Sequence, residues 1–271
     1  LLVIDEIISH IKKYKYDNIP PISLYYQVYL TTVDDENLDH YYKLKALLEE
    51  HSLKFSKQEA LTIYYSAINY SIRKINSGNQ KFLDELFDLY HDLIVKEIIF
   101  INDEISPWDF KNIVVLALRL GKYSWAESFI FRYNEKITEA FRENAVTFNL
   151  AHVYFYQREY DKVIEQLQNV EYEDVTYNLD SKSILIATYY EMDELEPLYS
   201  LFESFRVYLN RHKSIPEKRR TGYKNLIKFT KKLTKIMPGD QKSIQKLREE
   251  INNSKQIASV RWLKEKISEL E

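Results

Sequence analysis

Apolar residues recur along most of this chain at intervals of three and four residues, the spacing of one face of an α-helix. The segment 80–98 is a clear case, because its apolar stripe keeps that spacing over several turns: Phe82, Leu86, Leu89, Leu93 and Ile94. No stretch shows the sustained alternation of apolar and polar residues that is typical of a strand. The pattern therefore predicts an all-α protein of about thirteen or fourteen helices joined by short turns.

Start and stop residues mark the ends of several predicted helices. Ser56 is followed three residues later by Glu59, which matches a capping box, where each side chain satisfies a free backbone N–H. A second helix starts at Ser106, with proline at the first helical position. The two helices end at glycines, which suit the left-handed position after a helix. Breaks are expected at four further places: Pro20, Pro21, Pro216 and 237–240.

Three consecutive stretches, 110–133, 148–170 and 182–205, share one pattern. Each has an apolar helix with a small residue, at Ala117, Ala151 and Ala187, followed by a polar turn. Each then restarts with an apolar residue that closes the corner, and these residues are 37 and 35 positions apart: Tyr123, Tyr160 and Leu195. Periods of this size are typical of stacked helical hairpins, because one hairpin cannot bury its own apolar face.

The second stretch resembles the tetratricopeptide repeat (TPR). It follows that family's order of leucine, small residue, tyrosine and a second aromatic residue: Leu150, Ala151, Tyr154 and Tyr160. The first stretch does so with Ile113, Gly121, Tyr123 and Ala126. The second departs from the family at Arg158, where the family has a turn glycine, and at Val163, where it has a small residue; the spacing also exceeds the family's 34 residues by one to three.

The resemblance covers about 100–210 and implies a right-handed α-solenoid, a TPR-like superhelix of stacked antiparallel hairpins. We expect residues 1–210 to form irregular and TPR-like hairpins of this solenoid. Residues 211–271 are expected to add basic and amphipathic capping helices continuous with it. The segment 259–271 would be the last of these, with Val260, Leu263 and Ile267 on one stripe. A helical bundle with accidental similarity is the alternative.

In peptide-binding TPR proteins, the first helix of each hairpin lines a concave groove. The resemblance therefore implies a non-catalytic scaffold that binds a peptide or protein partner with six residues: Lys111, Asn112, Arg119, Asn149, His152 and Tyr156. Asn112 and Asn149 lie one period apart, where an asparagine of that family can bind a peptide backbone or a terminal carboxylate. The alternative is that these are ordinary polar residues on an exposed helix face.

Charge is distributed unevenly. The chain has a net charge of −3, but residues 211–236 carry +9, residues 237–271 carry +1 and residues 1–210 carry −13. The basic segment is predicted to be an amphipathic helix with Tyr223, Leu226, Ile227 and Leu233 facing the core. Its cations form a candidate patch: Lys218, Arg219, Arg220, Lys224, Lys228, Lys231 and Lys232. One hypothesis is nucleic-acid binding or regulation, with Tyr223 or Phe229 stacking on bases. The other is a solvated helix face.

The sequence carries no local catalytic signature. The absence of cysteine excludes disulfides, thiolate metal sites and a cysteine nucleophile. The six histidines form no paired zinc motif, and the four glycines are too scattered for a phosphate-binding loop. Carboxylates at 34–36 could hold Mg²⁺, but Asp34 or Asp35 also suits a helix cap. We expect that the protein is not an enzyme and that it binds no metal or cofactor. An all-α enzyme with dispersed carboxylates is the alternative.

The expected cellular compartment depends on two features that the sequence lacks, a membrane-spanning segment and a signal peptide. No apolar run approaches the roughly 18 residues that a membrane helix needs. The start of the chain does not resemble a signal peptide. We therefore expect a cytoplasmic protein that does not bind membranes. Because Leu1 is not methionine and the helical pattern is already established there, the sequence indicates a piece of a longer protein.

Overall fold

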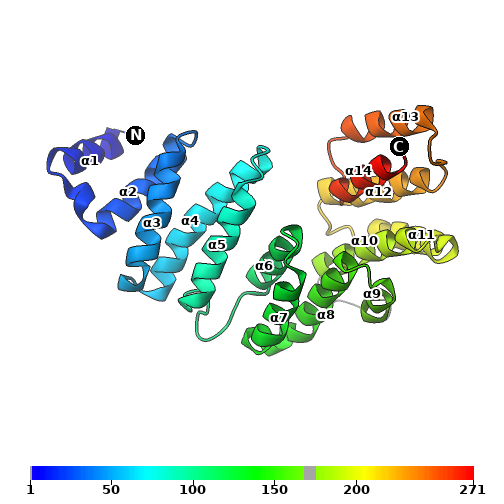
Figure 1. The fold of residues 1–271 in the computed structure, drawn as a ribbon, viewed down its shortest axis with the longest axis horizontal. Coiled ribbons are helices and arrows are strands. Elements are labelled where there is room, and N and C mark those ends of the chain that lie inside the picture. The colour runs from blue at the N-terminus through cyan, green and yellow to red at the C-terminus, as the bar shows by residue number, and fades with distance from the viewer. Residues whose placement is uncertain (1, 168–174) are drawn as a thin grey trace. The chain divides into compact units, whose positions relative to one another are not determined.

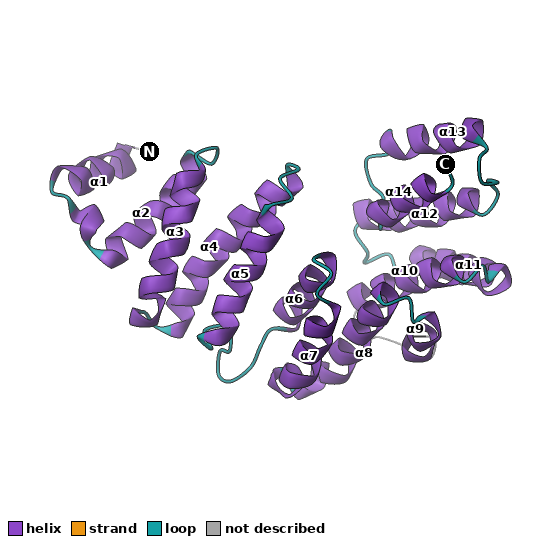
Figure 2. Cartoon of the chain, viewed as in Figure 1, coloured by secondary structure: helices purple, strands orange, loops and turns teal. Residues whose placement is uncertain are grey.

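The computed structural model describes residues 2–167 and 175–271 (Figure 1). Within these residues the protein is all-helical, with fourteen α-helices, three short 3₁₀ helices and no strand (Figure 2). The prediction of an all-α protein with thirteen or fourteen helices is confirmed. An isolated β-bridge joins Ile101 and Glu104. In the described part of the chain, no helix is both long and apolar enough to cross a bilayer.

The chain divides into two compact units, residues 1–142 and 143–271. In the first unit each helix packs on helices near it in sequence, with α2 against α3, α4 against α5 and α6 against α7. The helices of this unit are α1 (Leu2–Lys13), α2 (Pro20–Val33), α3 (Leu38–His51), α4 (Lys57–Asn76), α5 (Phe82–Val95), α6 (Pro107–Arg119) and α7 (Tyr123–Tyr133).

The second unit is built around α10, which packs on α9, α11 and α12, and around α12, which also packs on α13 and α14. Its helices are α8 (Glu139–Tyr156), which begins just before the unit, α9 (Tyr160–Leu167), α10 (Val175–Glu191), α11 (Leu195–Arg211), α12 (Glu217–Leu233), α13 (Gln241–Asn252) and α14 (Val260–Glu269). The amphipathic helices predicted for the end of the chain are therefore present. One residue differs, because Val260 is 38% exposed rather than part of the buried stripe.

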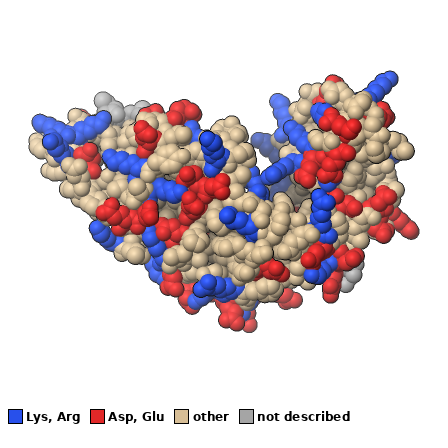
Figure 3. All heavy atoms as spheres, viewed as in Figure 1, with Lys and Arg blue, Asp and Glu red and all other residues tan. Residues whose placement is uncertain are grey.

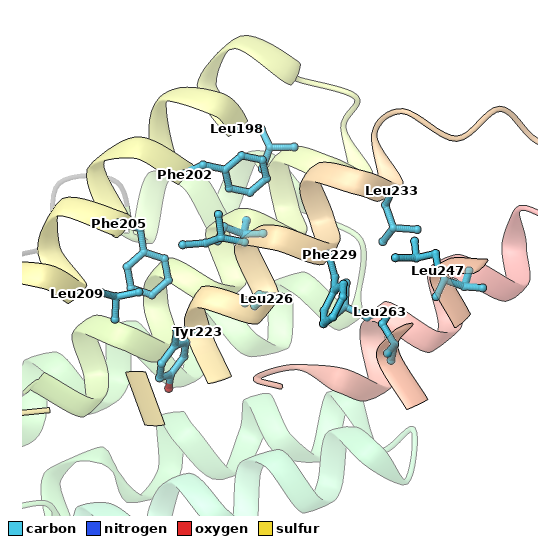
Figure 4. Packing of buried hydrophobic residues seen from close by; sticks show 14 of the residues in the cluster. Leu198, Phe202, Phe205, Leu209, Tyr223, Leu226, Phe229, Leu233, Leu247 and Leu263 are labelled. Atoms are coloured by element: carbon cyan, nitrogen blue, oxygen red, sulfur yellow. The ribbon is translucent and has the colours of Figure 1, made fainter. Parts of the chain in front are cut away.

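A continuous apolar core joins α11 and α12 to the last two helices (Figure 4). α11 contributes a buried row of side chains: Leu198, Phe202, Phe205 and Leu209. α12 contributes Leu226, Phe229 and Leu233, and α13 and α14 add Leu247 and Leu263. Burial of such side chains stabilises a fold by about 1.5–3 kcal/mol each, so this core fixes the rotation of α12 about its own axis.

The helix ends confirm much of the capping prediction. The Ser56 hydroxyl accepts a hydrogen bond from the Glu59 N–H at 3.2 Å, and Ser106 accepts one from Trp108 at 3.2 Å. α2 begins at Pro20, and Pro216 directly precedes α12.

The expected cap at Asp34 or Asp35 is wrong. The cap of α3 is Asn37, whose side chain accepts from the Asp39 N–H at 3.2 Å. Asn37 directly precedes the helix, whereas the two aspartates lie too far upstream to reach its first free N–H groups.

A left-handed turn recurs in the three predicted hairpins, at Gly121 (φ 71°), Arg158 (φ 64°) and Asp193 (φ 57°). In each, the next residue donates its N–H at 2.9 Å to a carbonyl five positions earlier, as in a Schellman motif. These bonds run from Lys122 to Ala117, from Glu159 to Tyr154 and from Glu194 to Tyr189. The second helices start at the three predicted residues, so the predicted period recurs in the backbone. A superhelix of these hairpins stays a prediction.

Replacing Arg158 by glycine is expected to raise the free energy of unfolding by about 1 kcal/mol, because left-handed backbone costs a residue with a Cβ atom roughly that much. Chemical denaturation followed by circular dichroism measures the change. The matched control is Gly121→Ala, where a new Cβ would meet nothing within 4 Å. This variant should lose a similar free energy from backbone strain alone. Unchanged midpoints in both variants would contradict the expectation.

Candidate functional site

α11 and α12, joined by residues 212–216, together line a groove of about 530 Å³ in the second unit. α11 contributes Arg206 and Asn210, which lie one turn apart. α12 and the turn after it contribute the rest of the lining: Lys224, Ile227, Lys228, Lys231, Lys232 and Lys235. Six of these eight residues are cationic, so the groove concentrates positive charge in a concave surface, where low-dielectric walls strengthen the field.

The position of this basic groove follows from the amphipathic pattern of α12. Leu226, Phe229 and Leu233 are almost completely buried and hold one face of the helix in the core (Figure 4). With 3.6 residues per turn, Lys224 and Lys228 then lie on a different face. Both of these lysines are exposed. The core therefore presents the lysines as a stripe along the groove.

Part of the groove's charge is balanced within the protein. Glu203 on α11 lies 3.5 Å from Arg206 Nη1 and 3.9 Å from Lys231 Nζ. Lys232 forms an ion pair with Glu250 of α13, and its hydrogen bond is the main cause of a lowered pKa at Glu250. These pairs are partly exposed, so each contributes little to stability.

The remaining cations of the groove are not balanced in this way. Within the described residues, no acidic group lies at ion-pair distance from Lys224, Lys228 or Lys235. On the face that Figure 3 shows, acidic and basic side chains are interspersed over both units. The charge of Lys228 helps to lower the pKa of Glu250, so the excess of positive charge that a ligand could neutralise is greatest at Lys224 and Lys235.

Two arginines of the predicted basic patch have internal contacts instead. Arg219 Nη1 donates to the Thr176 hydroxyl at 3.0 Å, and Arg219 Nη2 lies 4.0 Å from Asp180 Oδ1. Arg220 Nη2 donates to the backbone carbonyls of Ile215 at 3.0 Å and Lys213 at 3.1 Å. These guanidinium groups hold α12 to α10 and to the α11–α12 connection, and ligand binding by Arg219 and Arg220 stays a prediction.

The other patch residues divide between the groove and the solvent. Lys224, Lys228, Lys231 and Lys232 line the groove, whereas Lys218 is exposed in the first turn of α12 and does not line it. Sequence reasoning missed the contributions of α11, Arg206 and Asn210. Their one-turn spacing, on the helix directly before the basic helix, is the only signal that could have found them.

The aromatic rings expected to stack on bases are buried. Phe229 is 0% and Tyr223 6% exposed. The Tyr223 hydroxyl donates to Asp180 Oδ1 at 2.6 Å, and burial raises the pKa of Tyr223. The stacking role is therefore wrong for both residues, since their rings pack in the core beneath the groove.

The predicted partner-binding residues of the first unit lie on α6. Asn112 is exposed, and Lys111 and Arg119 are half-buried. Lys111 Nζ lies 5.8 Å from the ring centre of Trp108, which is 52% exposed. These side chains reach the surface of their unit, so their role in binding stays a prediction.

The predicted partner-binding residues on α8 differ among themselves. Asn149 is 0% exposed, and its Nδ2 donates to the Ala145 carbonyl at 2.7 Å. The expectation of a groove-facing Asn149 is corrected, because every residue from Phe148 to Ala151 is buried and the helix is covered all round there. Tyr156 is exposed, and the His152 ring packs edge-on against Phe148 at 4.6 Å. Binding by His152 and Tyr156 stays a prediction.

The carboxylates near the start of α3 make structural contacts. Asp34 Oδ2 lies 3.2 Å from His40 Nε2, and Glu36 lies 3.1 Å from Lys74 Nζ. Among the described residues, no three His, Asp or Glu side chains converge in a way that could hold a metal ion.

Comparisons of the chain with protein-family models, with curated proteins and with solved structures found no match. The charge and geometry of the basic groove are therefore the grounds for a functional proposal.

Replacing a cation with internal contacts should lower the free energy of unfolding more than replacing a cation that lines the groove. Arg220→Gln is expected to lower the free energy of unfolding by about 1.5 kcal/mol, because two backbone carbonyls lose a charged donor. Lys224→Gln removes the same charge from the same helix but should change that free energy by less than about 0.5 kcal/mol. Urea denaturation of both variants tests this. Equal losses of free energy would mean that the contacts of Arg220 with the backbone do not stabilise the fold.

Proposed function

We propose that this chain is a non-catalytic protein-interaction module that binds an acidic segment of a partner protein in the basic groove on α11 and α12. The observation that carries the proposal is the set of three groove lysines, Lys224, Lys228 and Lys235, without an acidic neighbour at ion-pair distance in the described part of the chain. Unbalanced charge in a concave site attracts anions and speeds their association.

The form of the groove favours a protein segment over single-stranded nucleic acid. Binding of single strands without sequence preference gains much of its free energy from bases stacked on aromatic rings. The residues that line the basic groove include no aromatic ring, and Tyr223 and Phe229 lie in the core. The half-buried ring of Tyr199 is already covered by Lys231, whose Nζ lies 5.2 Å from the ring centre. The lysine methylene groups suit an apolar side chain, while the ammonium groups suit carboxylates.

The proposed architecture is the right-handed, TPR-like solenoid. Its support is the 37- and 35-residue spacing of the second-helix starts, Tyr123, Tyr160 and Leu195. The left-handed turn before each of them is a common helix end that also follows α4 at Gly78 and α5 at Glu97, so the spacing and not the turn carries the support. In such an array α11 and α12 are late helices, and the residues that line their groove are not the ones implied by the family resemblance. The surface residues on α6 and α8 remain a second candidate for partner binding.

Removing the three unbalanced charges should weaken binding of an acidic peptide. With a fluorescently labelled peptide rich in glutamate, K224Q/K228Q/K235Q is expected to raise the Kd about tenfold, since exposed charge pairs contribute up to about 1 kcal/mol each. Fluorescence anisotropy at low salt measures the Kd. Rising salt should weaken binding to the parent protein, because exposed charges are screened.

The matched control is K242Q/K246Q/K264Q, which removes three exposed lysines from α13 and α14 of the same unit. It should leave the Kd within about twofold, because these lysines do not line the groove. An equal loss in both triple variants, or no binding by the parent protein, would contradict the proposal. Binding of a duplex or single-stranded oligonucleotide that is tighter than peptide binding and is lost only in the groove variant would instead identify a nucleic-acid partner.

A further inference from the structure

The basic residues of the groove recur at intervals of four, three and four residues: Lys224, Lys228, Lys231 and Lys235. Such intervals keep side chains on one face of an α-helix. Lys224, Lys228 and Lys231 lie on α12, where a rise of 1.5 Å per residue gives them a span of about 10.5 Å. Lys235 lies in the turn that follows α12 and lines the same groove. A ligand that contacts all four ammonium groups therefore extends along α12 and past its end.

The core on the other side of α12 indicates which kind of element fits such a stripe. There the buried side chains of α11 recur at the same intervals: Leu198, Phe202, Phe205 and Leu209 (Figure 4). Two packed helices share one rise and one period, so a contact made at one turn can be repeated at the next. A helix in the basic groove would meet the lysine stripe in the same way.

An extended peptide matches the stripe less well. Its side chains return to one face at every second residue, which corresponds to about 6.6 Å along the strand. Three acidic side chains would then span about 13 Å, some 3 Å more than the three lysines on α12, and the mismatch grows along the groove. A helix with acidic residues at intervals of four and three spans about 10.5 Å, as these lysines do.

The α11 wall and the floor of the groove indicate that this ligand also has an apolar face. Arg206 and Asn210 extend from α11 one turn apart and offer donors on the opposite wall. Between the walls lie the methylene groups of the lysines, which favour apolar atoms, above the almost completely buried Ile227. A ligand that satisfies walls and floor together has carboxylates beside an apolar stripe.

We infer that the occupant of the basic groove is an acidic amphipathic α-helix of a partner protein. Its carboxylates recur at intervals of four, three and four residues, and its apolar stripe packs on the methylene groups of the groove lysines. This inference rests on the proposed function, because it specifies the form of the acidic segment. Binding of this kind lays the apolar face of a helix into a groove, and the charged pairs at the rim set orientation and association rate.

Two peptides of equal length and identical composition test the inference against the full 271-residue chain. Both contain four glutamates and two leucines among alanine and glutamine. One has the glutamates at intervals of four, three and four with the leucines along one flank; the other has the glutamates at alternate positions. We expect the first to bind at least fivefold more tightly in an anisotropy titration. Its ¹³Cα chemical shifts, measured with labelled peptide, should become helical on binding.

Two further measurements sharpen the test. A proline in the middle of the helically spaced peptide should weaken binding more than tenfold, since proline breaks a helix interior, whereas it should weaken the alternating peptide less than twofold. The preference between the peptides should disappear in K224Q/K228Q/K235Q. Equal or reversed affinities, or a bound peptide without helical shifts, would overturn the inference and leave the proposed function standing. If neither peptide binds, and a longer polyglutamate does not bind either, the proposed function itself fails.

Discussion

The apolar contact between α11 and α12 is the interaction on which the candidate site depends. Four side chains of α11 and the buried face of α12 share one core with α13 and α14. That core fixes which face of α12 is turned inward, and thereby which face carries lysines. Charge alone would give a flexible cationic segment. The buried residues turn it into an ordered groove in which the spacing of the ammonium groups is defined.

A second constraint acts at the connection between these helices. Arg220 lies on the same helical stripe as Lys224, four residues earlier, yet its guanidinium group binds the carbonyls of residues 213 and 215. The first turn of α12 lies beside the chain that enters it, so a long side chain there can reach the preceding backbone. The connection is thus held from within, and less conformational freedom is lost when a ligand binds between two helices already fixed in place.

Much of the fold could be predicted from the sequence, because helix period, caps and turn residues are local properties. The start of α12 after Pro216 and the corners at Tyr123, Tyr160 and Leu195 follow from a few neighbouring residues. The site was less predictable, because it depends on contacts between helices. Asn112 and Asn149 occupy equivalent positions in the repeat, but only the second is covered on all sides. The groove lysines could be identified as basic residues, whereas Arg206 joins them only through tertiary packing.

The left-handed turn at residues 121, 158 and 193 has a consequence for how such proteins are recognised. Glycine, arginine and aspartate fill the same backbone conformation, each within reach of what a folded chain tolerates. A hairpin can therefore keep its geometry although another residue stands where a glycine would indicate the turn in the sequence. A helix end of this form therefore does not require glycine, and each other residue there costs about one or two kilocalories per mole.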